Sequence, residues 1–160
     1  QDFGNAYSTF VAQNFGAGEQ ERIRRGTKTA FVMSGIFSLI ISAAVFIFAA
    51  PLMRIFIDAS ETQVIAAGVH YLRIEGAFYI GIGFLFLLYG YFRAIKRAGM
   101  SVVLTVISLG VRVLLAYALS SISSIGVTGI WVAIPIGWFL ADVTGLIYMK
   151  FLSSNAGTGV

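Results

Sequence analysis

Cysteine is absent from the sequence, His70 is the one histidine, and only 11% of the 160 residues are charged. Without cysteine there is no disulfide, no thiol nucleophile and no thiolate metal ligand. A single histidine excludes zinc sites built from several histidines and argues against Ser/His catalysis. Charged residues make up roughly a quarter of an average soluble domain, so this sequence has too few of them to cover a soluble fold.

Apolar residues dominate instead, because 58% of the chain is hydrophobic and the mean hydropathy is +0.88. A soluble fold of this size could not hide so much apolar surface from water. The formal net charge is +4, but the bases gather in short gaps between apolar runs and do not form one face. This distribution follows the positive-inside rule. We therefore expect an integral membrane protein whose partner is the lipid bilayer, with no nucleic-acid partner.

Four apolar runs predict four spanning helices, since each approaches or exceeds the roughly 20 residues that a bilayer requires. The runs cover about 30–50, 76–92, 98–119 and 127–149. We expect Pro51 to end the first helix. The third run is interrupted only by Arg112, and the fourth only by Asp142. The predicted fold class is an all-α, polytopic membrane helix bundle.

Basic and non-basic gaps alternate along the chain. The loop expected at 12–28 holds four bases, the gap after the second run holds three, and Lys150 follows the fourth run. The segment 52–75 mixes bases with acids, and 120–126 is uncharged. By the positive-inside rule, both ends of the chain and the loop 12–28 should face the cytoplasm, in the cytoplasmic (inner) membrane.

The segment 52–75 differs from the apolar runs in being amphipathic. Ser60 and Gln63 have the spacing of a capping box, which predicts that a helix begins there. If that helix continued without a break to Phe92, it would exceed a bilayer core of ~30 Å, so its first turns should lie at or above the outer interface. The small, polar residues 153–160 are expected to be disordered.

Polar residues inside the runs are the candidate transport-pathway residues. The third run carries Ser101, Thr105, Ser108 and Arg112 at steps of 4, 3 and 4. An arginine is costly against lipid, so this stripe should face the bundle interior or an aqueous cavity. Hydrogen bonds between packed helices are the alternative for its hydroxyl groups. The first run repeats the pattern weakly with its own serines, Ser34, Ser38 and Ser42.

Three ionisable residues, Glu75, Arg112 and Asp142, complete the candidates together with Tyr79. The helical rise places Glu75 and Arg112 at similar depth, which favours this pair. Asp142 lies deeper toward the cytoplasm and should meet a base of the cytoplasmic loops or a polar cavity. An ionisable residue in a span is a functional candidate, although an interfacial Glu75 and a structural Asp142 near the headgroups remain alternatives.

Small residues recur at helical spacing in two runs. In the fourth run, small residues recur at every fourth position: Gly129, Ala133, Gly137, Ala141 and Gly145. In the second run, glycines recur at every seventh position: Gly76, Gly83 and Gly90. Small residues let helix backbones approach closely in membranes. They predict helix packing, with direct substrate contact as the alternative.

Four segments in order resemble the C-terminal third of a MATE (multidrug and toxic compound extrusion) transporter. They are "STFVAQNFGAGEQERIRRG", "YLRIEGAFY", "GYFRAIKRAGMSVVLTVISLGVRVLLAY" and "GVTGIWVAIPIGWFLAD". The resemblance implies twelve spans in two six-helix lobes. Residues 1–14 would then end the eighth span, and the four runs would be the ninth to twelfth, as part of the C-terminal lobe.

The same resemblance implies a cation-coupled antiporter that exports organic cations or amphiphilic drugs in exchange for Na⁺ or H⁺. Its partners would be the N-terminal lobe of the same protein and small drug-like substrates, with no cofactor and no metal site. Residues that match the family's cytoplasmic loop motif and the basic end of its tenth span are Gln13, Asn14, Gly16, Ala17 and Arg93. Arg112 matches the arginine of the eleventh span.

One departure from the family concerns the coupling ion. Several members have a coupling carboxylate in the tenth span, where this sequence has Ile82 between Gly81 and Gly83. The resemblance therefore implies that the ion site lies outside this chain, on carboxylates of the N-terminal lobe.

Three other functions are compatible with a membrane helix bundle. A lipid-linked saccharide flippase of similar architecture would need a strongly cationic cavity, and Arg112 is the one base inside a run. A stand-alone four-helix structural membrane protein is disfavoured because the chain begins at Gln1, without Met or a visible signal peptide, and we expect coding sequence upstream. An intramembrane enzyme is disfavoured by the missing cysteine, the single histidine and the lack of paired carboxylates.

Overall fold

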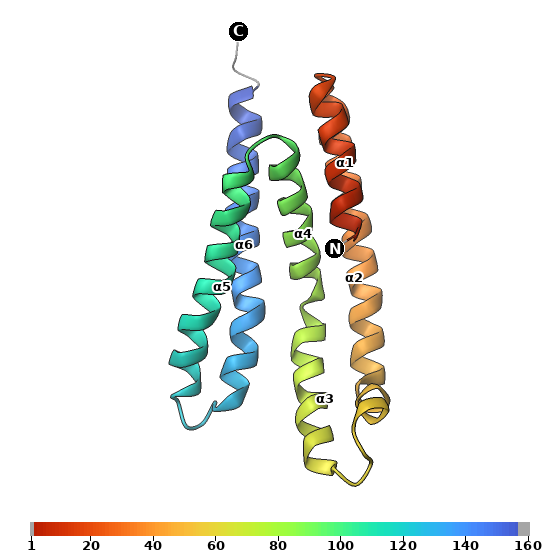
Figure 1. The fold of residues 1–160 in the computed structure, drawn as a ribbon, viewed down its shortest axis with the longest axis vertical. Helices are drawn as coiled ribbons and strands as arrows, with labels where there is room; N and C mark the ends of the chain where they lie inside the picture. The colour runs from red at the N-terminus through yellow and green to blue at the C-terminus, as the bar shows by residue number, and fades with distance from the viewer. Residues whose placement is uncertain (1, 157–160) are drawn as a thin grey trace.

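The computed structural model describes residues 2–156, which form six helices and, over that range, no strand (Figure 1). The helices are α1 (Asp2–Gly16), α2 (Gln20–Phe56), α3 (Thr62–Ala77), α4 (Tyr79–Ala94), α5 (Ala98–Ser120) and α6 (Val127–Ala156). Helices α2, α5 and α6 are long and apolar enough to cross a membrane, and α3 with α4 adds a fourth span if this bent pair is one span. The all-α membrane bundle that the composition predicts is confirmed.

The helices run up and down between two ends. In Figure 1 the α1–α2 turn, the α4–α5 connection and the C-terminal end of α6 lie at the top, the α2–α3 and α5–α6 connections lie at the bottom, and the break between α3 and α4 lies between the two ends. We call the top the basic end, because it holds Arg22, Arg24, Arg25, Lys28, Arg93, Lys96, Arg97 and Lys150. These are eight of the eleven Lys and Arg residues of the chain.

The segment 12–28, expected as a loop, is mostly helical. Helix α1 runs to Gly16 and α2 begins at Gln20, so the turn comprises only three residues, with Gly18 at φ +75°. The bases of this segment lie on the first turns of α2, where Arg24 and Arg25 each pair with Glu21 at 2.8 Å. Pairs at this spacing stabilise a helix, which explains why the helix begins earlier than the apolar run.

Helix α2 also ends later than expected, because it continues through Pro51 to Phe56. Proline removes one backbone hydrogen bond, but neighbouring elements can hold a membrane helix in place beyond it. Here the turn after Pro51 carries Met53, which packs against Gly68 of α3. The expectation that Pro51 ends the helix is wrong.

The capping box expected at Ser60 does not form. Helix α3 begins at Thr62 and Glu61 precedes it without a side-chain cap. The N–H and hydroxyl of Ser60 instead donate to Oδ1 of Asp58, at 2.9 and 2.7 Å. These two bonds hold the pKa of the Asp58 carboxyl below its ordinary value, and the bond from the backbone N–H has the larger effect. The competing turn at Asp58 thus takes the serine from the helix.

A continuous helix to Phe92 is not formed either. Helix α3 ends at Ala77, α4 begins at Tyr79, and the two are bent by 50°. The break follows Gly76, a residue with low helix propensity, which is buried against Val45 of α2.

The disorder expected for the tail is wrong over residues 153–156, because α6 extends to Ala156 and its Met149 and Leu152 pack on the core. The rest of that tail, 157–160, lies outside the described residues.

Helix α4 contributes to both hydrophobic clusters of the bundle. The first cluster joins α4 to α5 and α6 and consists of Leu85, Leu88, Phe92, Leu104, Trp138 and Ala141. The second cluster joins α4 to α1 and α2 and consists of Tyr7, Val11, Ile23, Ala30 and Leu87. Large apolar side chains elsewhere point outward, including Ile47 (68% exposed) and Leu114 (72% exposed). A hydrophobic exterior of this kind fits a bilayer or further membrane helices.

The small residues allow close helix contacts, as their spacing predicts. A Cβ added to Gly137 of α6 would lie 2.5 Å from the carbonyl oxygen of Ser108 on α5. A Cβ added to Gly90 of α4 would lie 2.6 Å from the carbonyl oxygen of Gly4 on α1. In both cases the neighbour is backbone, which cannot give way as a flexible side chain would.

Replacing Gly90 with Ala is therefore expected to lower the stability of the full-length protein by about 1–3 kcal/mol, the usual cost of overpacking. The measurement is the thermal unfolding midpoint in detergent. Gly110→Ala is the matched control, because nothing lies within 4 Å of that position and Ala favours a helix over Gly by about 1 kcal/mol. Equal midpoints for both variants would contradict the close α1–α4 contact.

Candidate functional site

Three ionisable residues from three helices lie in the part of the bundle built around α6. Glu75 is on α3, Arg112 on α5 and Asp142 on α6. The two carboxylates are 5% and 7% exposed, and Arg112 is partly buried. Helix α3 reaches α6 through stacking of His70 and Tyr71 on Trp131. The fold therefore brings to one helix side chains that are up to 67 residues apart in the sequence.

Arg112 and Asp142 lie on either side of one turn of α6. The Arg112 guanidinium is 6.0 Å from the ring centroid of Trp138, within reach of a cation–π interaction. Asp142 follows Trp138 by one helical turn and faces α4, where a Cβ added to Gly81 would lie 3.7 Å from its Oδ2. The Asp142 carboxylate thus packs next to Gly81, at a distance that would be ordinary van der Waals contact for an added Cβ.

The second glycine beside Ile82 has a similar role on the opposite side of α4. A Cβ added to Gly83 would lie 2.8 Å from Oγ of Ser38 and 3.0 Å from Oγ of Ser34, both buried on α2. Helix α4 has no acid of its own at this level, but a carboxylate of α6 and two hydroxyls of α2 pack against it there. The sequence showed both glycines, but not which polar groups they face.

Each of the three ionisable residues has a buried atom without a hydrogen-bond partner among the described residues: Glu75 Oε1, Arg112 Nε and Asp142 Oδ1. The expected Glu75–Arg112 ion pair is not formed, and Asp142 does not meet a base of the loops; the ion pairs found within residues 2–156 join Glu21 to Arg24 and Arg25. A charge that is buried without a partner costs several kcal/mol. Such groups become neutral, bind an ion, or find a partner in another conformation.

The polar stripe of α5 is divided between two roles. Ser101 donates to the Tyr89 carbonyl oxygen at 3.4 Å. Exposed Thr105 donates to the Ser101 carbonyl oxygen of its own helix at 2.9 Å, and its Oγ1 also lies within hydrogen-bond distance of the Tyr89 hydroxyl, at 3.3 Å. These two residues make hydrogen bonds between helices, which was the alternative to lining a pathway. Ser108 is buried where its carbonyl meets Gly137, one turn before Arg112. Tyr89, which links them, was not among the sequence candidates.

Tyr79 is the first residue of α4, directly after the helix break, and is partly buried. It comes four residues after Glu75, but the bend between α3 and α4 separates the two helices at this point. Tyr79 therefore lies at the bend between α3 and α4.

The expected loop motif lies mainly on the last turn of α1. Gln13, Asn14 and Gly16 are helical, and only Ala17 belongs to the turn. Asn14 is buried, its Nδ2 donates to the Phe10 carbonyl at 2.8 Å, and its own carbonyl accepts the Glu19 N–H at 2.9 Å. Arg93, on the last turn of α4, donates to Asn5 Oδ1 of α1 at 3.4 Å. These contacts end α1 and tie it to α4.

Within the described residues, no group of three or more His, Asp or Glu side chains could hold a metal ion. What the three ionisable residues can do is to bind or release a proton, or to exchange partners when the helices move.

Comparison with known proteins supplies the family. The MatE family model matches residues 2–118, which is most of the chain and ends within α5. Among the curated proteins, none matches the sequence.

Three solved structures share the fold. The first is described as the inward-facing conformation of a multidrug resistance MATE family transporter of the MOP superfamily, with a TM-score of 0.88 and 22% identity over 98% of this chain. The second is described as the outward-facing conformation of a multidrug resistance MATE family transporter of the MOP superfamily, with a TM-score of 0.89 and 21% identity over 98% of this chain. The third is described as a crystal structure of MATE in complex with MaL6, with a TM-score of 0.88 and 20% identity over 96% of this chain. The chain spans only 36%, 35% and 35% of their lengths. Together with the match of the family model, this shared fold shows that the chain belongs to the MatE family.

Proposed function

We propose that this chain is part of the C-terminal lobe of a cation-coupled multidrug efflux antiporter, which exports organic cations or amphiphilic drugs by alternating access. The observation that carries the proposal is the match of the MatE family model over residues 2–118. The shared fold with proteins described as multidrug resistance transporters supports it. The function is transport and not catalysis, and the N-terminal lobe of the same protein is the main partner.

Rigid-body movement of the lobe is supported by the shape of the chain. It matches an inward-facing and an outward-facing relative almost equally, with TM-scores of 0.88 and 0.89. A segment that changed shape during transport would fit one state better than the other. Alternating access would then come from rocking of one lobe against the other, with these helices moving as a unit.

The distribution of bases supports the orientation. Eight of the eleven Lys and Arg residues lie at the basic end, and the positive-inside rule assigns such an end to the cytoplasm. In this orientation both ends of the chain are cytoplasmic and the membrane is the inner membrane. The coupling ion, Na⁺ or H⁺, binds to carboxylates of the N-terminal lobe, because Ile82 stands where several family members have an acid.

Export by the full-length protein should depend on an ion gradient. Reconstituted into vesicles, the protein is expected to move a cationic dye only while a Na⁺ or H⁺ gradient is imposed, because the gradient supplies the driving force. Dye fluorescence measures the movement, and vesicles in which both gradients have been collapsed by ionophores are the control. Export that continues after the collapse, or that requires ATP, would contradict the proposal.

A further inference from the structure

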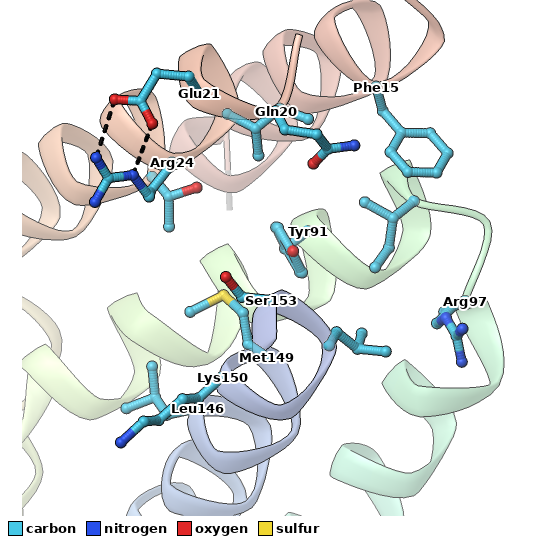
Figure 2. Close-up of a pocket in the computed structure, with 14 residues that line it drawn as sticks. Phe15, Gln20, Glu21, Arg24, Tyr91, Arg97, Leu146, Met149, Lys150 and Ser153 are labelled. Carbon is cyan, nitrogen blue, oxygen red and sulfur yellow. Dashed lines mark hydrogen bonds and ion pairs between the residues drawn. The ribbon is translucent and has the colours of Figure 1, made fainter. Parts of the chain in front are cut away.

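A cavity of about 620 Å³ lies at the basic end, away from Glu75, Arg112 and Asp142. In Figure 2, Glu21 and Arg24 project from α2 on one side, Met149 and Ser153 of α6 lie on the other, and Tyr91 of α4 stands between them. The cavity is therefore formed where the ends of three helices diverge. Neither the packing of the core nor the proposed transport function uses it.

The walls of the cavity are mostly apolar. Ile23 of α2, Ile95 after α4, and Leu146, Met149 and Leu152 of α6 all line it. A cavity with such walls suits a hydrocarbon chain better than a hydrated ion. The apolar lining alone does not identify an occupant, but the charges beside it do.

Basic side chains outnumber acidic ones around the cavity. Arg24, Arg97 and Lys150 line it together with one acid, Glu21. Glu21 already accepts hydrogen bonds from Arg24 and from Arg25, at 2.8 Å each. Arg97 donates to the Tyr148 hydroxyl at 3.0 Å, and within the described residues neither Arg97 nor Lys150 has an ion-pair partner.

The position of Arg97 is set by the backbone. Lys96 adopts a left-handed conformation at φ +60°, and the Arg97 N–H donates to the Phe92 carbonyl at 2.8 Å. This tight end of α4 leaves Arg97 beside the last turns of α6, which carry Lys150. Arg97 and Lys150, which have no ion-pair partner among the described residues, thus line the apolar cavity on opposite sides (Figure 2).

We propose that this cavity binds an anionic phospholipid from the leaflet at the basic end, with the phosphate beside Arg97, an acyl chain along the apolar wall, and Lys150 adding a second positive charge to the lining. Basic pockets between membrane helices bind anionic headgroups in this way. Among the described residues, Glu21 is the one acid that lines the cavity, and it is already paired with Arg24 and Arg25. A lipid supplies both the anion and the apolar group.

The test compares two double variants of the full-length protein that lose the same charge. Arg97→Gln with Lys150→Gln removes bases that line the cavity, and Arg22→Gln with Lys28→Gln removes two nearby bases that do not. Binding of phosphatidylglycerol and of phosphatidylcholine is titrated by native mass spectrometry in a neutral detergent. At about fivefold for each base, the first variant should bind phosphatidylglycerol roughly 25-fold more weakly, and the second should bind like the unmodified protein.

Further arms separate the site from its alternatives. Tyr148→Phe removes the hydrogen bond to Arg97 but not the charge of Arg97, so the affinity for phosphatidylglycerol should be kept. Met149→Trp should fill the cavity and lower that affinity. Equal losses in the two double variants would overturn the proposal, because they would show general surface attraction. Equal binding of both lipids, or full competition by inorganic phosphate alone, would also overturn it.

Discussion

Asp142→Asn is expected to lower gradient-driven dye export roughly tenfold or more, within the 1–3 kcal/mol range usual for coupled sites, without loss of stability. The carboxylate is 7% exposed, its Oδ1 has no partner in the described part of the chain, and it fits against Gly81. Asparagine has nearly the same shape but carries no charge. Removing an unpartnered buried charge is neutral or stabilising for a fold, so a loss of export at an unchanged unfolding midpoint indicates a functional role.

The measurements are the initial rate of dye export in vesicles and the thermal unfolding midpoint of the same preparation. Glu61→Gln is the matched control, because it also neutralises one acid but at an exposed position before α3. If Asp142→Asn exported dye as fast as the control, Asp142 would be a structural acid, which was the alternative considered from the sequence.

Glu75 and Arg112 are expected to be coupled in transport although they are unpaired in this structure. Glu75→Gln and Arg112→Gln should each lower export roughly tenfold, while the double variant should lose little more than either single one. The reason is that each residue has a buried atom without a partner among residues 2–156, and a second arrangement of the two side chains that pairs them would relieve both costs. Coupling of residues in contact is typically 0.5–3 kcal/mol in such cycles.

Export rates of the four proteins in this double-mutant cycle give the coupling energy. A second cycle with Arg73→Gln in place of Arg112→Gln is the control, because the Arg73 guanidinium lies 5.1 Å from the centroid of the Phe46 ring and faces a different group. Strictly additive losses for Glu75 and Arg112 would refute the exchange of partners.

Much of the fold was predictable because it depends on local properties of the chain. Apolar run length predicted membrane helices, and α5 covers the third run. The spacing of small residues predicted close contacts, which occur at Gly90 and Gly137. Helix ends were less predictable: ion pairs at Glu21 extended α2 backward, and Met53 against Gly68 supports the turn beyond Pro51.

The candidate site was predictable in its members but not in its contacts. A charge inside an apolar run is visible in any sequence, so Arg112 and Asp142 could be identified from it. Their surroundings could not, because Gly81 is 61 positions from Asp142 in the chain. The serines illustrate the same limit, since Ser101 and Thr105 bond to Tyr89 of the neighbouring helix.

The sequence by itself therefore determined the membrane class, the helical fold and the gathering of bases at one end. Hydrophobicity, charge and residue size are written along the chain, and the bilayer selects on them directly. Only the tertiary structure decided the break at Phe78, the placement of Asp142 against Gly81, and the unpaired state of Glu75 and Arg112. These features depend on which helix faces which, and that choice is made by side-chain packing between residues far apart in the chain.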